Sequence, residues 1–182
     1  GLEWYIIKLK DEFEWDNYLF NYQLKEDEIY SVIRHKPNQE IDRDEIITPY
    51  AVSLNIKNKS LDKLGLISKE IDLNHITFKI DIPSLKGVLI ASESGYLLLN
   101  FINNKVYKLI NNSKLNILES QAGSRIQNAF EYNGKIYFNK YSNEKLFNIK
   151  LELSDFKEES YPLYNKFSKN EFPFTLMFLL LI

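Results

Sequence analysis

The chain contains no cysteine, which excludes a disulfide framework and any metal site with thiolate ligands. Histidine is almost as scarce, with only His35 and His75. A zinc site would therefore need two or more carboxylates converging from elsewhere in the fold. We expect no metal site and no cofactor. The first residues, Gly1–Trp4, lack the basic start and apolar core of a signal peptide, so the sequence indicates no compartment.

An excess of one charge is also lacking. Lys and Arg number 23 and Asp and Glu 25, interspersed along the chain, for a net charge of −2. Nucleic acids and anionic membranes are bound by concentrated positive charge, so neither is an expected partner. The apolar run 176–182 is far shorter than the roughly 20 residues that span a bilayer. Two interpretations stay open for it: a core strand or the edge of a fragment, and a transmembrane helix that is cut off.

Glycine and proline are few, at 6 and 5 residues, whereas Tyr and Phe each number 12. Aromatic residues favour strands, and 182 residues are enough for one domain with a sizeable core. We therefore predict a single all-β domain over residues 1–182. Because the chain does not begin with Met, we expect it to be truncated at one or both ends.

Local patterns predict the strands. Residues 75–82 alternate Ile76, Phe78, Ile80 and Ile82 with polar residues, which is typical of a strand with one buried face. Asn133-Gly134 predicts a type I′ hairpin, and Pro49 predicts a strand start or edge. Further strands are expected at residues 4–9, 17–24, 28–33, 46–57, 87–92, 95–102, 106–110, 115–118, 126–132, 135–140, 145–153 and 156–161.

A short phrase recurs along the chain: a hydrophobic run that ends in Asn, a polar turn, and a second hydrophobic run. Its copies end at Asn21, Asn55, Asn100 and Asn139. A period of about forty residues is the mark of a repeat architecture, in which units of three or four strands stack on one another. The candidate units are residues 4–35, 46–74, 75–120 and 124–161.

Two segments carry a family resemblance. Residues 132–138 followed by 146–149 look like the second and third strands of a propeller blade, and residues 95–99 with 106–109 look like the blade before. Over residues 75–161 the chain resembles the divergent β-propellers of bacterial sensor, surface and lyase-associated proteins. The resemblance implies a partial propeller-like array of antiparallel meanders, with a ligand or partner held by loops at one end of the blades.

An alternative fold is α+β with a single antiparallel sheet. Residues 37–47 have Pro near a possible first helical turn, and Leu61, Leu64, Ile67 and Ile71 fit helical spacing. Two packed helices at 37–47 and 61–71 would favour this alternative.

No catalytic residue is assigned from the sequence. Three candidate groups are more simply read as charged faces and turns: the alternating Glu12, Glu14 and Asp16, the cluster Asp42-Arg43-Asp44-Glu45, and the serines Ser92, Ser94 and Ser124. The acidic cluster lacks the Gly of a calcium loop, and the serines lack a nucleophile elbow. The aromatic residues Trp4, Trp15, Tyr18 and Tyr22 are either a ligand platform or core.

Three functions follow from these observations. The leading hypothesis is a non-catalytic binding or protein-interaction module on propeller-like blades, with a protein, small ligand or carbohydrate as partner. The second is a small bacterial immunity or accessory α+β interaction protein. The third is a propeller-based polysaccharide hydrolase or lyase, which would require Glu12, Asp42 or Asp44 to converge with Arg34 or His35.

Overall fold

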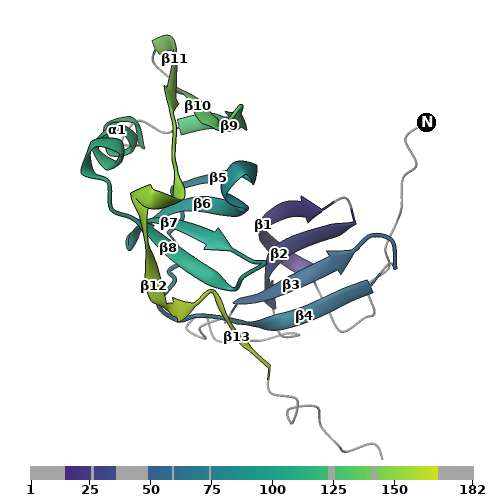
Figure 1. Ribbon diagram of the computed structural model, residues 1–182. Coiled ribbons are helices and arrows are strands. Elements are labelled where there is room, and N and C mark those ends of the chain that lie inside the picture. Colours follow the sequence, from purple (N-terminus) through teal and green to yellow (C-terminus); the bar gives the residue numbers. More distant parts are fainter. Residues whose placement is uncertain are drawn as a thin grey trace, which may run out of the picture.

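Residues 15–25, 27–35, 49–58, 60–73, 75–122, 126–140 and 143–167 are described by the computed structural model of the chain. In these ranges thirteen strands form three antiparallel sheets, accompanied by one α-helix and two 3₁₀ turns (Figure 1). The prediction of an all-β fold is confirmed. The alternative with a single sheet is wrong, because the strands divide into three sheets.

Sheet A has the strand order β1-β2-β3-β4-β13. Its strands are β1 (Trp15–Lys25), β2 (Glu28–His35), β3 (Pro49–Asn55), β4 (Ser60–Ile67) and β13 (Tyr164–Lys166). Lys25 pairs with Glu28 at the tip of the first hairpin, and Pro49 starts a strand as predicted. The first four strands form a meander, and β13 joins from far along the chain.

Sheet B has the order β12-β8-β7-β6-β5. Its strands are β5 (Phe78–Ile82), β6 (Gly87–Ser92), β7 (Gly95–Asn100), β8 (Lys105–Leu109) and β12 (Phe156–Pro162), with the 3₁₀ turn η1 (Pro83–Leu85) between β5 and β6. The predicted alternation in β5 is confirmed, since Phe78, Ile80 and Ile82 are buried and Lys79 and Asp81 are exposed. By contrast, β7 is buried along its length after Gly95, which indicates cover on both faces of the sheet.

Sheet C contains β9 (Ile126–Tyr132), β10 (Lys135–Lys140) and β11 (Asn143–Ile149), in the order β11-β10-β9. The turn between β9 and β10 has φ values of 50° at Asn133 and 69° at Gly134. Positive φ at both central residues is what a type I′ turn requires, so the predicted hairpin is confirmed.

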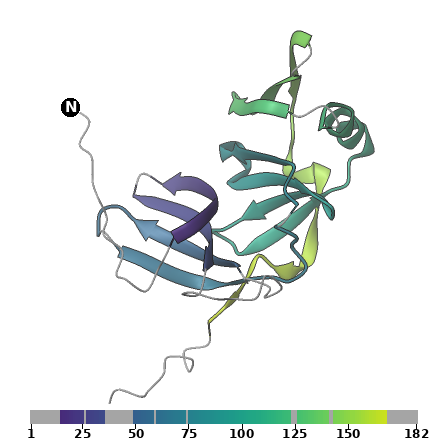
Figure 2. The ribbon, with the colours of Figure 1, turned by 180° about the vertical axis from the view of Figure 1, so that it is seen from behind.

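The three sheets stack with sheet B in the middle, as the front and back views show (Figures 1 and 2). One face of sheet B contributes Leu97 and Leu99 to a core shared with Val32 and Ala51 of sheet A. Its other face contributes Leu98 to a second core shared with sheet C. The second core also holds Ile136, Phe138, Ile149, Leu151, Phe156 and Leu118. Sheet B therefore contributes one face to each of two hydrophobic cores.

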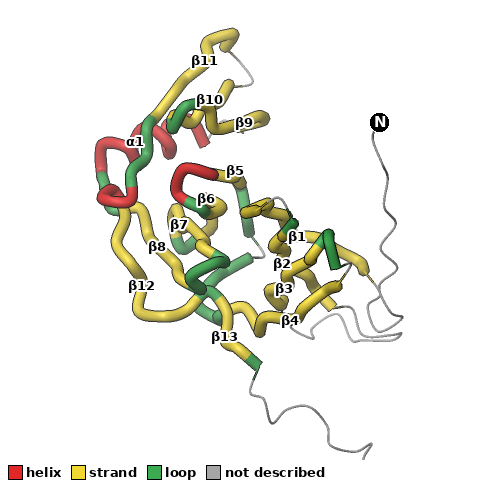
Figure 3. Tube along the Cα trace, turned by 45° about the vertical axis from the view of Figure 1, so that its right-hand side comes forward, coloured by secondary structure: helices red, strands yellow, loops and turns green. Residues whose placement is uncertain are grey.

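Residues 156–166 close the edges of two sheets in succession. Strand β12 pairs with β8, and β13 then pairs with β4 (Figure 3). Between them Leu163 is fully buried, and its backbone bonds to Asn104 of the β7–β8 turn and Ser68 after β4. The Asn104 amide also donates to the Tyr164 carbonyl oxygen at 2.9 Å and accepts from the Tyr164 N–H at 2.8 Å. Sheets A and B are thus joined by hydrogen bonds as well as by their core.

The recurring Asn has a structural role in two of its copies. The Asn55 side-chain oxygen accepts from the N–H of Asn58 at 2.8 Å, after β3. The Asn100 oxygen accepts in the same way from the N–H of Asn103 at 3.0 Å, after β7. Both therefore stabilise a turn that leads into the next strand. Asn21 and Asn139 lie within β1 and β10.

Three sequence predictions need a correction, and three others lie outside the described residues. Helix α1 (Asn112–Ala122) replaces the strand predicted at 115–118. Asn111 is the N-cap of the helix, because its carbonyl oxygen accepts a hydrogen bond from the Leu115 N–H and its side-chain oxygen accepts one from the Lys114 N–H. The predicted strand 145–153 ends at Ile149, and the 3₁₀ turn η2 (Leu153–Asp155) follows. The helical reading of 61–71 is wrong because β4 pairs on both sides, and 37–47, 4–9 and 176–182 lie outside the described residues.

Candidate functional site

Asp72 and His75 lie on the connection from β4 to β5, with their side chains at the surface of the protein. Ile71 and Leu73, on either side of Asp72, are both buried in the core between sheets A and B. The backbone of this segment turns at Ser68, whose carbonyl accepts from the Ile71 N–H at 3.0 Å. The burial of its two neighbours therefore fixes the backbone that carries Asp72.

The hairpin between β6 and β7 brings Glu93 to the same place. Phe78 pairs with Ala91 in the β5–β6 ladder, and the Thr77 N–H also donates to the Ala91 carbonyl at 3.0 Å. Continuing this antiparallel register places residue 93 beside residue 76. The His75 Nδ1 lies 3.0 Å from Asp72 Oδ2 and 3.7 Å from Glu93 Oε1. We refer to Asp72, His75 and Glu93 as the loop triad.

The loop triad is polar and accessible. The side chains of His75 and Glu93 are 64% and 74% exposed, whereas that of Asp72 is 25% exposed. A hydrogen bond to Asp72 and the negative charges of Asp72 and Glu93 raise the pKa of His75. In the described part of the chain, these three residues form the one group of His, Asp and Glu side chains with the spacing of metal ligands. The triad can hold either a proton or a cation.

A second candidate surface is the face of sheet C that points away from sheet B. Ile136 and Phe138 of β10 point into the core, so the alternating Tyr137 and Lys135 lie on the opposite face. Phe130 is directly opposite Tyr137 on β9, and the two rings stack with centroids 5.5 Å apart and planes at 16°. Phe130 is 52% exposed and Tyr132 is 62% exposed. This set of Phe130, Tyr132 and Tyr137 is called the aromatic face.

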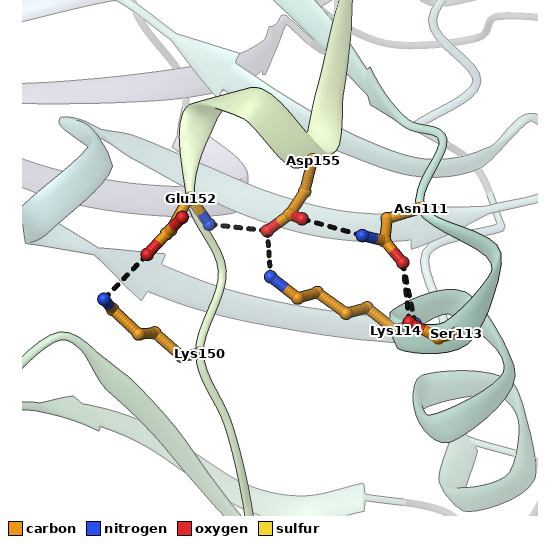
Figure 4. A network of polar contacts seen from close by, with 6 residues as sticks. All are labelled: Asn111, Ser113, Lys114, Lys150, Glu152 and Asp155. Atoms are coloured by element: carbon orange, nitrogen blue, oxygen red, sulfur yellow. Dashed lines mark hydrogen bonds and ion pairs between the residues drawn. The ribbon is translucent and has the colours of Figure 1, made fainter.

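A third cluster surrounds Asp155 and has a structural role (Figure 4). The carboxylate is buried and pairs with Lys114 of α1. It also accepts from the Asn111 amide at 3.0 Å and from the Glu152 N–H at 2.7 Å. Burial alone would raise the pKa of Asp155, but the hydrogen bonds and charge of Lys114, with those from Glu152 and Asn111, lower it overall. The cluster ties the start of α1 to η2 and β12.

Among the residues singled out from the sequence, the β1–β2 ladder pairs Trp15 with His35. Asp16, Trp15, Tyr18 and Tyr22 lie on β1, and Arg34 and His35 lie at the end of β2. Ser92 and Ser94 belong to the β6–β7 hairpin, where the Ser92 hydroxyl accepts from the Ser94 N–H at 3.2 Å. The remaining candidates lie outside the described residues: Trp4, Glu12, Glu14, Asp42, Arg43, Asp44, Glu45 and Ser124.

From the sequence, His75 was one of two histidines and no metal site was expected, so neither of its two carboxylate neighbours was predicted. Part of the signal was present in the β5 pattern, because antiparallel pairing of β5 with β6, in the register Phe78 to Ala91, places the segment before β5 beside the Glu93-Ser94 turn that follows β6. The aromatic face was also missed, because alternation alone does not say which face of a strand is covered.

Comparisons of the chain with protein-family models, with curated proteins and with solved structures give no match. Within the described ranges, no helix has the length and hydrophobicity needed to cross a membrane.

Proposed function

We propose that the chain is a non-catalytic protein-interaction module built on propeller-like blades, and that its docking surface is the aromatic face of sheet C. One observation carries the proposal. Sheet C buries one face against sheet B and exposes Phe130 and Tyr132 on the other. Contiguous exposed aromatic residues on a sheet are typical of a surface that a protein partner covers.

The order of the sheets supports the propeller-like part of the proposal. Each blade of a propeller packs its two faces against two neighbours, as sheet B does. Sheets A and B are both meanders in chain order with an added C-terminal strand, and the same Asn-capped turn follows β3 and β7. Sheets A and C each have one described neighbour, sheet B, so sheet C is one of the two ends at which the stack can be extended.

The occupant we propose for the aromatic face is a second copy of this chain. The Phe130–Tyr137 pair forms an aromatic centre, and Lys135 and Asn148 are exposed polar residues at neighbouring positions of the sheet. An apolar centre with a polar rim is the usual anatomy of a protein interface. Two copies would present the same centre and rim to each other, which is the requirement for a twofold symmetric interface. They would stack sheet on sheet, as sheets B and C do within one chain.

The test is the molar mass of the full chain in solution, measured by sedimentation velocity over a wide concentration range. We expect a monomer–dimer equilibrium. The double variant Phe130→Ser/Tyr132→Ser should raise the dimer dissociation constant by about tenfold or more, because aromatic residues dominate interface energetics.

Ile110→Ser is the matched control, since Ile110 is as exposed as Phe130, at 52%, but lies outside the aromatic face. It should leave the dissociation constant unchanged, and circular dichroism should confirm that all variants are folded. A chain that is monomeric throughout, or a double variant that dimerises as well as the wild type, would refute the proposed docking surface.

A further inference from the structure

We propose that the loop triad, Asp72, His75 and Glu93, is a binding site for a divalent transition-metal ion, with Zn²⁺ as its representative. The site lies on the connection from sheet A to sheet B and at the tip of the β6–β7 hairpin. It is separate from the aromatic face, so it does not depend on the proposed function.

The distances between the ligand atoms fit a shared ion. The His75 Nδ1 is 3.0 Å from the Asp72 carboxylate and 3.7 Å from that of Glu93, and all three ligand atoms lie within 4.8 Å of one another. Ligands that bind one zinc ion at about 2.0–2.2 Å lie about 3–4 Å from each other. The Glu93 side chain is 74% exposed and can make the small movement that closes the site.

The backbone that carries the ligands is fixed independently of the contacts among them. Ile71 and Leu73 anchor the segment around Asp72 in the core. The Thr77–Ala91 hydrogen bond and the β5–β6 ladder place the segment before β5, which carries His75, beside the β6–β7 turn, which carries Glu93. A site that is held in place before the ion arrives loses little conformational entropy on binding.

The donor set indicates the class of ion. One imidazole nitrogen and two carboxylate oxygens suit Zn²⁺ and its first-row neighbours, whereas Ca²⁺ takes six to eight oxygen ligands and Mg²⁺ keeps most of its water. With the imidazole neutral, two carboxylates balance the charge of the ion. Three protein ligands leave a position of a tetrahedral ion open to water or to a fourth ligand. Bound metal would link the β4–β5 connection to the β6–β7 hairpin.

The test is isothermal titration of the chelator-treated full chain with ZnCl₂. We expect one ion per chain and, for both His75→Ala and Glu93→Gln, an affinity at least about tenfold lower. Thermal unfolding gives a second readout, because an ion that binds only the folded chain raises the melting temperature of the wild type more than that of either variant. MgCl₂ should give no such shift.

Two matched controls keep the result specific. His35→Ala removes the other histidine of the chain, and Glu158→Gln removes an exposed carboxylate elsewhere. Both should bind Zn²⁺ as the wild type does. His75 and Glu93 are exposed, so their variants should stay folded. The absence of Zn²⁺ binding, an undiminished affinity in His75→Ala, or an equal loss in His35→Ala would overturn the site.

Discussion

Asp155 carries a negative charge into the packed contact between α1 and β12, where its side chain is only 7% exposed. A charge at such a position is tolerated when it is paired and its remaining lone pairs accept hydrogen bonds. Lys114, Asn111 and the Glu152 N–H provide these partners. The carboxylate thereby joins the start of α1 to η2, next to the end of the β8–β12 ladder where Leu109 pairs with Phe156.

Replacing Asp155 by Asn should lower the free energy of unfolding by about 2–3 kcal/mol. The Asn side chain would replace one acceptor oxygen by an NH₂ group, which is itself a donor. In one orientation this group faces Lys114 and the Glu152 N–H, and in the other it faces the Asn111 amide, so a hydrogen bond is lost either way. Urea denaturation at neutral pH measures the change. Glu158→Gln, which disrupts an exposed pair with Lys105, is the control and should cost less than about 1 kcal/mol.

Measuring the free energy of unfolding of the wild type and of Asp155→Asn at several pH values tests whether the loss of stability is electrostatic in origin. The pKa of Asp155 is lower in the folded chain than its usual value of about 3.9. The stability that its charge contributes is therefore present above that usual value and is lost as the pH falls through the folded pKa. The difference between wild type and Asp155→Asn should shrink as the pH is lowered from 7 toward 3. A difference that stays constant would contradict the charge-based explanation.

At the residue scale, the sequence predicted the backbone conformation of single turns better than it predicted which side chains contact each other. The Asn133-Gly134 turn was predictable because its conformation depends on two adjacent residues. The recurring Asn was visible as a pattern, but its role as a turn cap needed the contact between Asn100 and Asn103. His75 gained its carboxylate neighbours from two segments, and one of these, at Glu93, is separated from it by two strands.

At the element scale, the short strand β13 depends on close backbone approach to β4. A Cβ atom built on Gly65 would lie 2.0 Å from the backbone oxygen of Asn165. No side chain fits at that distance, so a residue other than glycine must push the two strands apart. Glycine at this position therefore allows the C-terminal strand to complete sheet A.

Gly65→Ala should detach β13 from β4 while leaving the other ladders paired. We expect a loss of about 1–3 kcal/mol in the free energy of unfolding, which is typical of overpacking. Hydrogen exchange should be at least about tenfold faster over residues 164–166.

Gly134→Ala is the control for this substitution. It should cost about 1–2 kcal/mol, because Gly134 has a φ of 69°, but it should leave exchange in β13 unchanged. Unaltered exchange over residues 164–166 in Gly65→Ala would contradict the proposed dependence.

Elements with strong local signals were predicted, including the strand at 156–161 that is β12, whereas α1 and β13 were not. The alternation of Phe78, Ile80 and Ile82 fixed β5 because one face of that strand is buried. Helix α1 was missed because Leu118 is the one fully buried side chain among residues 112–119, the part of the helix whose burial is described, so its apolar stripe is weak there. The positions of β12 and β13 depend on partners in sheets B and A, which no local pattern specifies.

At the scale of the whole molecule, sheet B couples the two hydrophobic cores. Leu98 and Leu99 are adjacent and fully buried, but Leu98 faces sheet C and Leu99 faces sheet A. Neither neighbouring sheet can keep its core if sheet B unfolds. The stacked sheets should therefore unfold as one cooperative unit rather than as independent repeats.

Leu98→Ala and Leu99→Ala test this coupling from the two sides of one strand. Each leaves a cavity and should lower the free energy of unfolding by about 2–5 kcal/mol, whereas Leu153→Ala, at a side chain that is 51% exposed, should change it by less than about 1 kcal/mol. If unfolding is cooperative, the slowest amide protons exchange only when the whole molecule unfolds. Either substitution should then accelerate their exchange by the same factor in β3 of sheet A and in β10 of sheet C. If Leu98→Ala accelerates exchange in β10 but leaves β3 protected, sheet B does not couple the cores and the sheets behave as separate units.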